Sequence, residues 1–499
     1  MKNLNSRAEL VLIRPNGKAI MYHGVRQSAV AVDPPYWLAA MGGYIRDKGI
    51  DVALIDAEAA AQTPEETADE VRRLNPKLIG VLTLGGNLTA STWTMPGAGI
   101  LCRALREAAP DIPVFMWGNH PSALPERTLR EEQIDYVVVG EGFDVVERLY
   151  HYCAAGNPKR DMIQGLNYLD NDVLCGNGNV SVIHDLSTLP VDGWDLFPSN
   201  QRHYRNHMHF AFENMSKRDR YGAILSSLGC PHGCTYCAVR TFSGNTQRVR
   251  FKDVHMAITE VDWWVKNRDV YYLRILDECF TADRNFAMEF SKLLKKRGYN
   301  LSLWINARID NVDEEMLITM REAGIKWLGY GIESANDHIR KLSRKNQYDF
   351  ELTKRIVKLT QSCDQYICGN LMLGLPGETH EDMEYDLKAY RELNVEYPNI
   401  YCTMAYPGSN LYDFVLKSNP EWFPDSWAGY AQLSYETQPL PTEHLSSAEI
   451  LRFRDYAFSA YFKDNDRYFN MIRHKFGEPA VAAVNDMLKG KLKRKLLGD

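Results

Sequence analysis

One stretch of the chain decides the fold: Leu228-Gly229-Cys230-Pro231-His232-Gly233-Cys234-Thr235-Tyr236-Cys237. Its cysteines are separated by three and then two other residues, so a single loop can bring their thiolates together. The chain has 10 cysteines among 499 residues, and this is too few for a disulfide framework. Thiolates are the usual ligands of iron–sulfur clusters. We therefore expect Cys230, Cys234 and Cys237 to bind a 4Fe–4S cluster, with one iron left open to another ligand.

Two other interpretations of these cysteines compete with a cluster. A structural zinc site normally has four Cys or His ligands, and His232 lies inside the loop, between two of the cysteines. Scattered, chemically inert thiols are the second alternative, and the close spacing argues against them.

The loop follows the first strand of an alternating series of strands and helices. Strands are predicted at residues 222–228, 270–276, 301–306, 326–331, 367–374 and 399–405. Helices are predicted between them, for example at 254–265, 286–296, 314–322 and 348–360. Six such units are too few for a closed eight-stranded barrel, so we expect a partial (β/α)6 barrel. In such barrels the functional residues gather at the carboxyl ends of the strands, and the cysteine loop follows such an end.

The first 155 residues alternate in the same way. Buried parallel strands are predicted at 10–13, 52–55, 78–82, 113–117 and 136–139, and amphipathic helices at 36–47, 65–74, 98–108 and 123–131. Five such units predict a doubly wound, Rossmann-like α/β sheet, which binds ligands beyond the carboxyl ends of its strands. The turns at those ends form the expected ligand rim: Asn16, Gly17, Gly85, Gly86, Asn87, Gly118, Asn119, His120, Gly140 and Glu141.

The rest of the chain separates and follows these two segments. Residues 156–220 lose the alternation, and the stretch 167–182, rich in Asn, Asp and Gly, predicts a hairpin or linker. We therefore divide the chain into an α/β domain (1–155), a linker (156–220), a barrel (221–415) and a helical C-terminal segment (416–499). The aromatic side chains of the last segment are interpreted as core rather than as the wall of a substrate pocket.

Charge and hydropathy exclude several classes of partner. There are 58 basic and 64 acidic side chains, a formal net charge of −6, which argues against nucleic acid or an anionic membrane bound mainly by charge. No run approaches the ~20 apolar residues that cross a bilayer, and the apolar run at 10–13 is too short for a signal peptide. We expect a soluble, cytoplasmic protein with no nucleic-acid partner and no membrane span.

The cysteine spacing, with the aromatic Tyr236 before the third cysteine, resembles the CX3CXΦC hallmark of the radical SAM superfamily. The resemblance extends across the barrel, because each later strand is followed by a matching short motif. These motifs are Asp277-Glu278-Cys279-Phe280, Trp304-Ile305-Asn306-Ala307-Arg308, Gly331-Ile332-Glu333-Ser334, Gly374-Leu375-Pro376-Gly377-Glu378-Thr379 and Tyr406-Pro407-Gly408-Ser409. The resemblance implies that the open iron binds S-adenosylmethionine (SAM), whose reductive cleavage gives a 5′-deoxyadenosyl radical.

By their positions in these motifs, the resemblance implies SAM contacts from six residues: Tyr236, Glu278, Arg308, Glu333, Gly374 and Pro407. Two structural alternatives remain open. Arg308 and Glu333 can form an ion pair that stabilises the barrel, and residues 374–379 can form a turn with a helix N-cap.

An open α/β sheet ahead of such a barrel resembles the cobalamin (B12)-binding members of the superfamily, which include the class B radical SAM methyltransferases. Asp33-Pro34-Pro35-Tyr36-Trp37-Leu38 and the stretch 118–125 carry this likeness. The resemblance implies that the ligand rim holds cobalamin, with the nucleotide tail at the point where the strand order reverses. The DxHxxG motif that supplies a histidine to cobalt is absent, so we expect five-coordinate or water-ligated cobalt in preference to a bond from His120. No G-x-G-x-x-G follows the first strand, which leaves a dinucleotide site with little support.

The resemblance implies methylation of an unactivated carbon, or of phosphorus, in a small-molecule biosynthetic intermediate by way of methylcobalamin. The alternative is a non-methylating cobalamin radical SAM cyclase, oxidase or dehydratase that acts on a tetrapyrrole or another natural product. A methylthiotransferase is disfavoured because Cys102, Cys153 and Cys175 do not all follow predicted strands. A non-enzymatic carrier of cobalamin or of a cluster would not need the strand-end motifs. Flavodoxin or ferredoxin is the expected low-potential electron donor.

Overall fold

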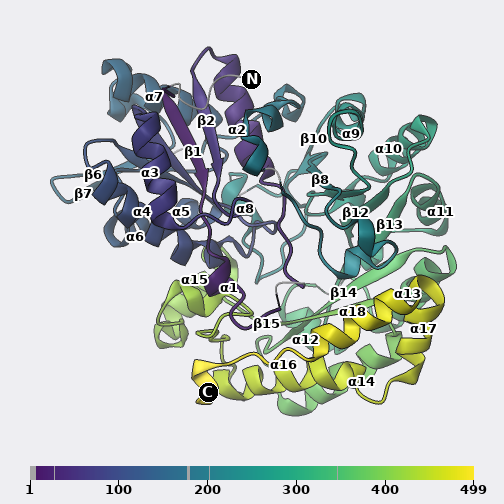
Figure 1. The fold of residues 1–499 in the computed structure, drawn as a ribbon. Helices are drawn as coiled ribbons and strands as arrows, with labels where there is room; N and C mark the ends of the chain where they lie inside the picture. The colour runs from purple at the N-terminus through teal and green to yellow at the C-terminus, as the bar shows by residue number, and fades with distance from the viewer. Residues whose placement is uncertain (1–6, 27–28, 177–179, 202, 245, 346) are drawn as a thin grey trace.

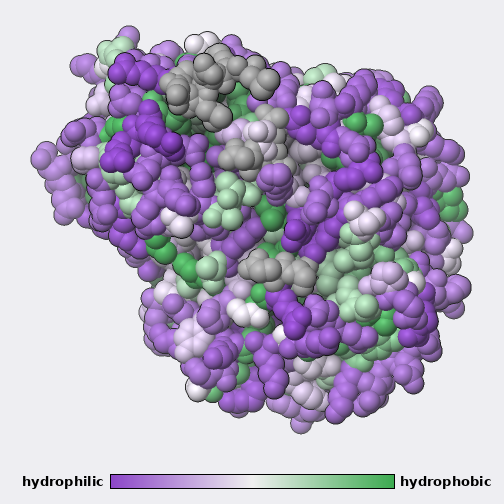
Figure 2. All heavy atoms as spheres, viewed as in Figure 1, coloured by the Kyte–Doolittle hydropathy of each residue, from purple (hydrophilic) through white to green (hydrophobic). Residues whose placement is uncertain are grey.

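Two sheets, one in each half of the molecule, organise the computed structural model (Figure 1). It describes residues 7–26, 29–176, 180–201, 203–244, 246–345 and 347–499. The first sheet lies in the N-terminal half and the second belongs to the barrel, while the last helices of the chain lie beside the barrel. Hydrophilic residues cover most of the face shown in Figure 2.

The first sheet has the strand order β2-β1-β3-β4-β5-β6-β7. Its parallel strands are β1 (Leu10–Arg14), β2 (Val52–Asp56), β3 (Leu78–Thr83), β4 (Val114–Gly118) and β5 (Tyr136–Val138). These strands agree with the predicted ones to within about one residue at each end. Because β1 lies between β2 and β3, the strand order reverses between β1 and β3, and this is where doubly wound sheets bind ligands.

Helices cover both faces of this sheet, as a doubly wound fold requires. They are α1 (Lys18–Met21), α2 (Tyr36–Asp47), α3 (Pro64–Leu74), α4 (Met95–Ala108), α5 (Asn119–Ala123), α6 (Pro125–Glu131) and α7 (Phe143–Ala155). Apolar residues of α3 and α4 pack on one face of the strands, and those of α2 and α7 on the other. The predicted helix 123–131 is two helices, because Pro125 cannot continue α5 and instead begins α6.

The stretch predicted as a hairpin or linker forms a hairpin that extends this first sheet. Strands β6 (Leu166–Asp170) and β7 (Val173–Gly176) pair with each other in the antiparallel sense, and β6 pairs with β5. The sheet therefore continues to residue 176, beyond the predicted end of the first domain at residue 155.

The second sheet has six strands in the order β15-β14-β13-β12-β11-β8, with all neighbours parallel. They are β8 (Tyr221–Ile224), β11 (Tyr272–Ile275), β12 (Ser302–Ala307), β13 (Ile325–Glu333), β14 (Tyr366–Leu373) and β15 (Tyr397–Cys402). Strands β8 and β15 are the two edges of the sheet, so it forms the partial barrel that six units predict.

The helices of the barrel are α8 (Val239–Phe242), α9 (Val254–Arg268), α10 (Arg284–Arg297), α11 (Glu314–Glu322), α12 (Asp337–Leu342), α13 (Phe350–Ser362) and α14 (His380–Leu393). Aspartate side chains accept backbone hydrogen bonds at the first turns of four of them. These caps are Asp253, Asp283, Asp313 and Asp349.

The predicted strand 222–228 is broken ahead of the cysteines. After β8, the short strand β9 (Ser227–Leu228) pairs in the antiparallel sense with β10 (Arg250–Phe251). The fully buried carboxylate of Asp277 causes the turn, because it accepts hydrogen bonds from Ser226 N at 2.8 Å, Ser226 Oγ at 2.6 Å and Ser227 Oγ at 2.7 Å.

The linker closes the amino end of the barrel. Phe210 and Phe212 are buried there and contact the ring of Trp327. The Glu213 carboxylate accepts a hydrogen bond from Ser302 Oγ at 2.5 Å and pairs with Lys326 Nζ at 2.8 Å, near the starts of β12 and β13. Access to the barrel interior is therefore from its carboxyl end and its open side.

The C-terminal segment is largely helical, as predicted. It contains α16 (Ser447–Phe462), α17 (Asp466–Phe476) and α18 (Glu478–Leu488), and α15 (Asn410–Ser418) crosses its predicted start at residue 416. Within the described ranges, no helix is both long and apolar enough to cross a membrane.

Candidate functional site

A cavity of about 860 Å³ lies between the two halves of the molecule. The wall includes the carboxyl ends of β1 and β3, the segment between β1 and α2, residues 207–210 of the linker, the interior of the barrel, and residues after β15. This volume is at the upper end of the range for ligand pockets, roughly 300–1,000 Å³. The cavity also lies where both folds bind ligands, namely at the switch point of the sheet and at the carboxyl end of the barrel.

All three cysteines of the predicted cluster line this cavity, on the loop of residues 229–238 that we call the cysteine loop. Gly229 begins the loop at φ +101°, where a Cβ would lie 2.7 Å from the Arg248 carbonyl oxygen, so only glycine fits. Burial raises the pKa of the Cys230 and Cys237 thiols.

The cysteine loop is anchored to the barrel by its own backbone. Thr235 N donates to Ser343 O at 3.2 Å, and Thr235 O accepts from Leu411 N at 2.8 Å. In the described part of the chain, no three Cys, His, Asp or Glu side chains converge as they would around a single metal ion. The three thiolates of a 4Fe–4S cluster bind three different irons, so they need not converge on one point.

The acidic motif after β11 supports this loop and faces the cavity. Glu278 lines the cavity, and its Oε2 accepts a hydrogen bond from Gly229 N at 2.9 Å. Burial raises the pKa of Glu278 to about 8. Because Asp277 holds the turn before the loop, the two adjacent carboxyl groups position the cysteines from one strand end.

Arg308 and Glu333 both line the cavity, together with Tyr236. The ion pair considered between Arg308 and Glu333 is not formed. Arg308 pairs with Asp310 at 2.9 Å, and Glu333 pairs with Lys345 at 2.7 Å.

Glu333 has an unusual backbone conformation, and its partner Lys345 comes from a distant position in the sequence. Glu333 has φ +66°, which is uncommon for a residue with a side chain and concentrates at functional sites. Lys345 was not predicted as a site residue. It lies 12 positions after Glu333 in the chain and no local motif marks it.

Gly374 and Pro407 do not line the cavity. Gly374 has φ +77°, and a Cβ there would lie 2.7 Å from Ile450 of α16. Glu378 accepts hydrogen bonds from the Gly374 and Leu375 amides, and Thr379 forms a capping box at the start of α14. The turn and N-cap alternative therefore describes residues 374–379.

On the sheet side, the wall comes from the loops after β1 and β3. Gly17, Gly85, Gly86 and Asn87 line the cavity, while Asn16 donates to Gln62 O at 3.0 Å beside it. A Cβ at Gly85 would lie 2.6 Å from Trp93 Nε1 and one at Gly86 would lie 2.8 Å from Asp33 Oδ2. These glycines therefore let the backbone form the wall where a side chain would not fit.

The other half of the predicted ligand rim lies away from the cavity. The cavity wall follows the switch point and not the whole edge of the sheet. It therefore does not include five of the expected rim residues: Gly118, Asn119, His120, Gly140 and Glu141. Three of these residues, Asn119, His120 and Glu141, are buried and contact neighbouring segments.

His120 packs edge-on against Trp427, with ring centroids 4.4 Å apart, and its Nδ1 lies 3.1 Å from Thr92 Oγ1. Burial lowers the pKa of His120 to about 3. Asn119 Nδ2 donates to Leu88 O at 3.1 Å, and Glu141 forms an ion pair with Arg250 of β10.

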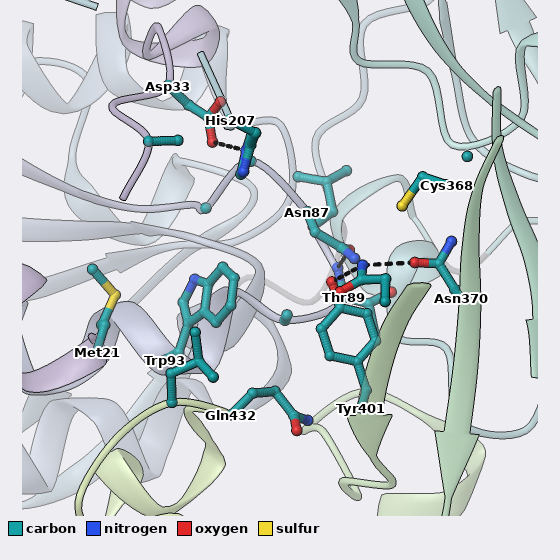
Figure 3. A pocket seen from close by; sticks show the side chains of 18 of the residues that line it. Met21, Asp33, Asn87, Thr89, Trp93, His207, Cys368, Asn370, Tyr401 and Gln432 are labelled. Atoms are coloured by element: carbon teal, nitrogen blue, oxygen red, sulfur yellow. Dashed lines mark hydrogen bonds and ion pairs between the residues drawn. The ribbon is translucent and has the colours of Figure 1, made fainter. Parts of the chain in front are cut away.

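A further polar cluster in the wall joins both halves of the molecule, and no motif predicted it. Asp33 accepts a hydrogen bond from Tyr221 OH at 2.8 Å and lies 3.5 Å from His207 Nε2 and 3.7 Å from Arg274 Nη1. Burial opposes ionisation, but His207, Arg274 and Tyr221 hold the pKa of Asp33 well below its usual range. Figure 3 shows Asp33 and His207 on one side of the cavity, with Asn370 and Tyr401 on the other.

Some buried polar atoms of residues in the wall have no hydrogen-bond partner. Among the described residues, Arg14 Nη2, His232 Nε2 and Arg274 Nε are buried without a hydrogen-bond partner. All three residues line the cavity. A buried polar group without a partner costs about 1–3 kcal/mol, so a hydrogen-bond acceptor beside the Arg14 or Arg274 guanidinium would relieve that cost.

Comparisons with known proteins agree with this geometry. A family model described as the B12 binding domain matches residues 22–150, and one described as the radical SAM superfamily matches residues 224–389. An uncharacterised methyltransferase of Pyrococcus horikoshii is 24% identical over 430 residues, which are 86% of this chain and 88% of that protein. An anaerobic magnesium-protoporphyrin IX monomethyl ester cyclase of Rubrivivax gelatinosus is 26% identical over 411 residues, 81% of this chain and 69% of the cyclase.

A solved structure shows the same arrangement of domains. The radical S-adenosylmethionine methyltransferase TsrM from Kitasatospora setae, with cobalamin and a [4Fe-4S] cluster bound, matches with a TM-score of 0.68 at 16% identity. The match covers 92% of this chain and 90% of TsrM. The chain therefore carries a B12-binding domain followed by a radical SAM domain, with one cavity between them.

Proposed function

We propose that this protein is a cobalamin-dependent radical SAM methyltransferase that methylates an unactivated carbon, or phosphorus, of a small molecule. The observation that carries the proposal is the shared cavity, whose wall contains both the cysteine loop and the glycine loops after β1 and β3. A carrier of either cofactor alone would not need one chamber that exposes both sites to the same ligand.

The residues of the wall divide into groups by what they would hold. Cys230, Cys234 and Cys237 would bind a 4Fe–4S cluster, and the loops after β1 and β3 would hold the tail of cobalamin. The polar residues at the ends of β11, β12 and β13, with Tyr236, would hold SAM; they are Glu278, Arg308 and Glu333. When bound, the cluster with SAM supplies an organic radical and cobalamin supplies the methyl group.

The barrel interior supplies the surface for the substrate. Asn399 Nδ2 donates to Asn370 Oδ1 at 2.8 Å, and Asn370 Nδ2 donates to Tyr330 O at 3.0 Å. This chain of amides is therefore fixed in orientation before a substrate enters. Phe210 and Phe212 of the linker are buried at the amino end of the barrel. They would keep water from entering the barrel at that end, and this would protect a radical from side reactions.

A non-methylating reaction is the second candidate, and the likeness to the Rubrivivax gelatinosus cyclase favours it. The cyclase is 26% identical to this chain and the methyltransferase relative 24%, so percentage identity does not separate the two reactions.

The test is an anaerobic assay of the reconstituted protein with SAM, a strong reductant and hydroxocobalamin, after gel filtration to measure retained corrinoid. Retained corrinoid, reductant-dependent 5′-deoxyadenosine and S-adenosylhomocysteine would support the methyltransferase. 5′-Deoxyadenosine without S-adenosylhomocysteine would favour the cyclase class. A protein with a confirmed cluster that cleaves no SAM would contradict both.

The proposal includes the partners expected from the sequence. A low-potential donor, flavodoxin or ferredoxin, would reduce the cluster, and the reaction would take place in the cytoplasm. Pull-down of the reduced donor by the holoprotein, with reduction followed spectroscopically, tests the first part.

A further inference from the structure

A hydroxyl of the B12-binding domain reaches a sulfur of the cysteine loop. Thr89 Oγ1 lies 3.2 Å from Cys237 Sγ, although the two residues are 148 positions apart in the chain. Thr89 lies on the loop of residues 84–90 that follows β3, which we call the β3 loop, and Figure 3 shows it beside Asn87 at the cavity. The contact therefore crosses from one half of the molecule to the other.

The β3 loop is held so that Thr89 keeps this position. Asn87 Oδ1 accepts from Thr89 N at 3.0 Å, and the Ser91 hydroxyl bridges Gly85 N at 3.3 Å and Asn87 O at 3.4 Å. Buried Asn119 donates to Leu88 O at 3.1 Å from the end of β4. The side chain of Thr89 is therefore presented by a fixed loop and not by a free one.

The direction of this hydrogen bond follows from the chemistry of a cluster ligand. A cysteine bound to iron is a thiolate without a proton, so Thr89 is the donor and Sγ the acceptor. Hydrogen bonds to the sulfurs are one of the factors that set the reduction potential of an iron–sulfur cluster. Because reduction adds negative charge, a donor stabilises the reduced form more than the oxidised form and makes reduction easier.

Thr89 differs from the other hydrogen-bond donors near these sulfurs because it belongs to the B12-binding domain. The backbone N–H group of His232, within the cysteine loop, interacts with Cys230. The backbone N–H group of Val239, directly after the loop, interacts with Cys237. Thr89 instead belongs to the same loop as Gly85 and Gly86, whose backbone lines the cavity on the B12 side.

We propose that Thr89 is a positioning residue for the cluster, which makes the cluster easier to reduce through its hydrogen bond to Cys237. This goes beyond the proposed reaction and rests only on the part of it that assigns a cluster to the cysteine loop. The B12-binding domain then has a direct effect on the redox chemistry of the barrel, in addition to holding its own cofactor.

The experiment compares wild type with Thr89→Val, which keeps the shape and removes the hydroxyl, and with Thr89→Ser, which restores a donor. Each reconstituted holoprotein is poised anaerobically near the wild-type midpoint, and the reduced cluster is quantified by electron paramagnetic resonance. We expect the ratio of reduced to oxidised cluster to fall by about threefold or more in T89V, because hydrogen bonds to charged acceptors are strong. T89S should recover most of the wild-type ratio.

A matched control separates this effect from general packing. Thr92→Val removes a hydroxyl from the next turn, which contacts His120 and not a cysteine, so the poised ratio should stay at the wild-type value. Equal ratios for wild type and T89V, or an equal fall in T92V, would overturn the proposal. Thr89→Ala carries the same expectation if T89V takes up no iron. This measurement needs neither SAM nor corrinoid, so failure of methyl transfer would not affect its outcome.

Discussion

Replacing Glu141 with glutamine tests whether the residue joins the two halves of the molecule or binds cofactor. The Glu141 side chain is fully buried, and that of Arg250 is 10% exposed. Two hydrogen bonds join them: Arg250 Nη1 donates to Glu141 Oε2 at 3.0 Å, and Arg250 Nη2 donates to Glu141 Oε1. Burial raises the pKa of Glu141 although Arg250 opposes the shift, so the pair does not fully offset its desolvation. Breaking such a pair costs about 3–5 kcal/mol, because one buried charge is left alone. Glutamine keeps one acceptor, so we expect a loss of about 3 kcal/mol.

Urea unfolding of E141Q, Arg250→Met and the double variant at one pH measures this value. The double variant should be less destabilised than the sum of the single variants, with a coupling of about 1 kcal/mol or more, because removing both charges leaves none unpaired. Retention of corrinoid should be unchanged in E141Q, since Glu141 does not line the cavity. Additive losses, or release of corrinoid from E141Q, would refute this reasoning.

Three further results are expected. Alanine at any one of the three cysteines in the cysteine loop should remove most of the iron from the reconstituted protein, whereas Cys279→Ala should keep it; equal iron in all four variants would contradict the cluster assignment. Gly86→Val should lower corrinoid retention after gel filtration at least about tenfold without changing iron content, because a side chain here meets Asp33. Burial raises the pKa values of both Glu378 and Asp386 above the usual range near 4, so the folded state binds protons more tightly than the unfolded chain. Their contribution to stability is therefore complete below about pH 4 and is lost as pH rises through the raised values. Asp386→Asn should flatten the fall in melting temperature between pH 5 and pH 8, and an unchanged slope would count against this.

Local patterns predicted most of the elements, because hydrophobic periodicity reports directly on burial. The helix at Tyr36–Asp47 agrees exactly, and the cysteine loop lies at the end of its strand as expected. Four of the ten residues expected in the ligand rim line the cavity. Turn composition marks every strand end alike, whereas the cavity forms only at the switch point between β1 and β3.

Residues that depend on the packing of distant segments could not be predicted. Lys345 reaches Glu333 from a loop, and the Asp33 cluster combines side chains from the N-terminal domain, the linker and the barrel. Neither group has a spacing pattern in the sequence. Gly374 was predicted from a motif, but its role in a turn depends on Ile450, 76 positions later in the chain.

The hairpin of β6 and β7 determines where the chain can be cut. A shortened chain that ends at residue 155 would leave the backbone N–H and C=O groups of β5 without their partners in β6. Unpaired edges of this kind recruit strands from other molecules and cause aggregation. The segment after β7 also contributes Ser181 O and Ile183 N to Glu141. During synthesis, therefore, the first sheet is completed only when the residues that lead into the barrel have emerged.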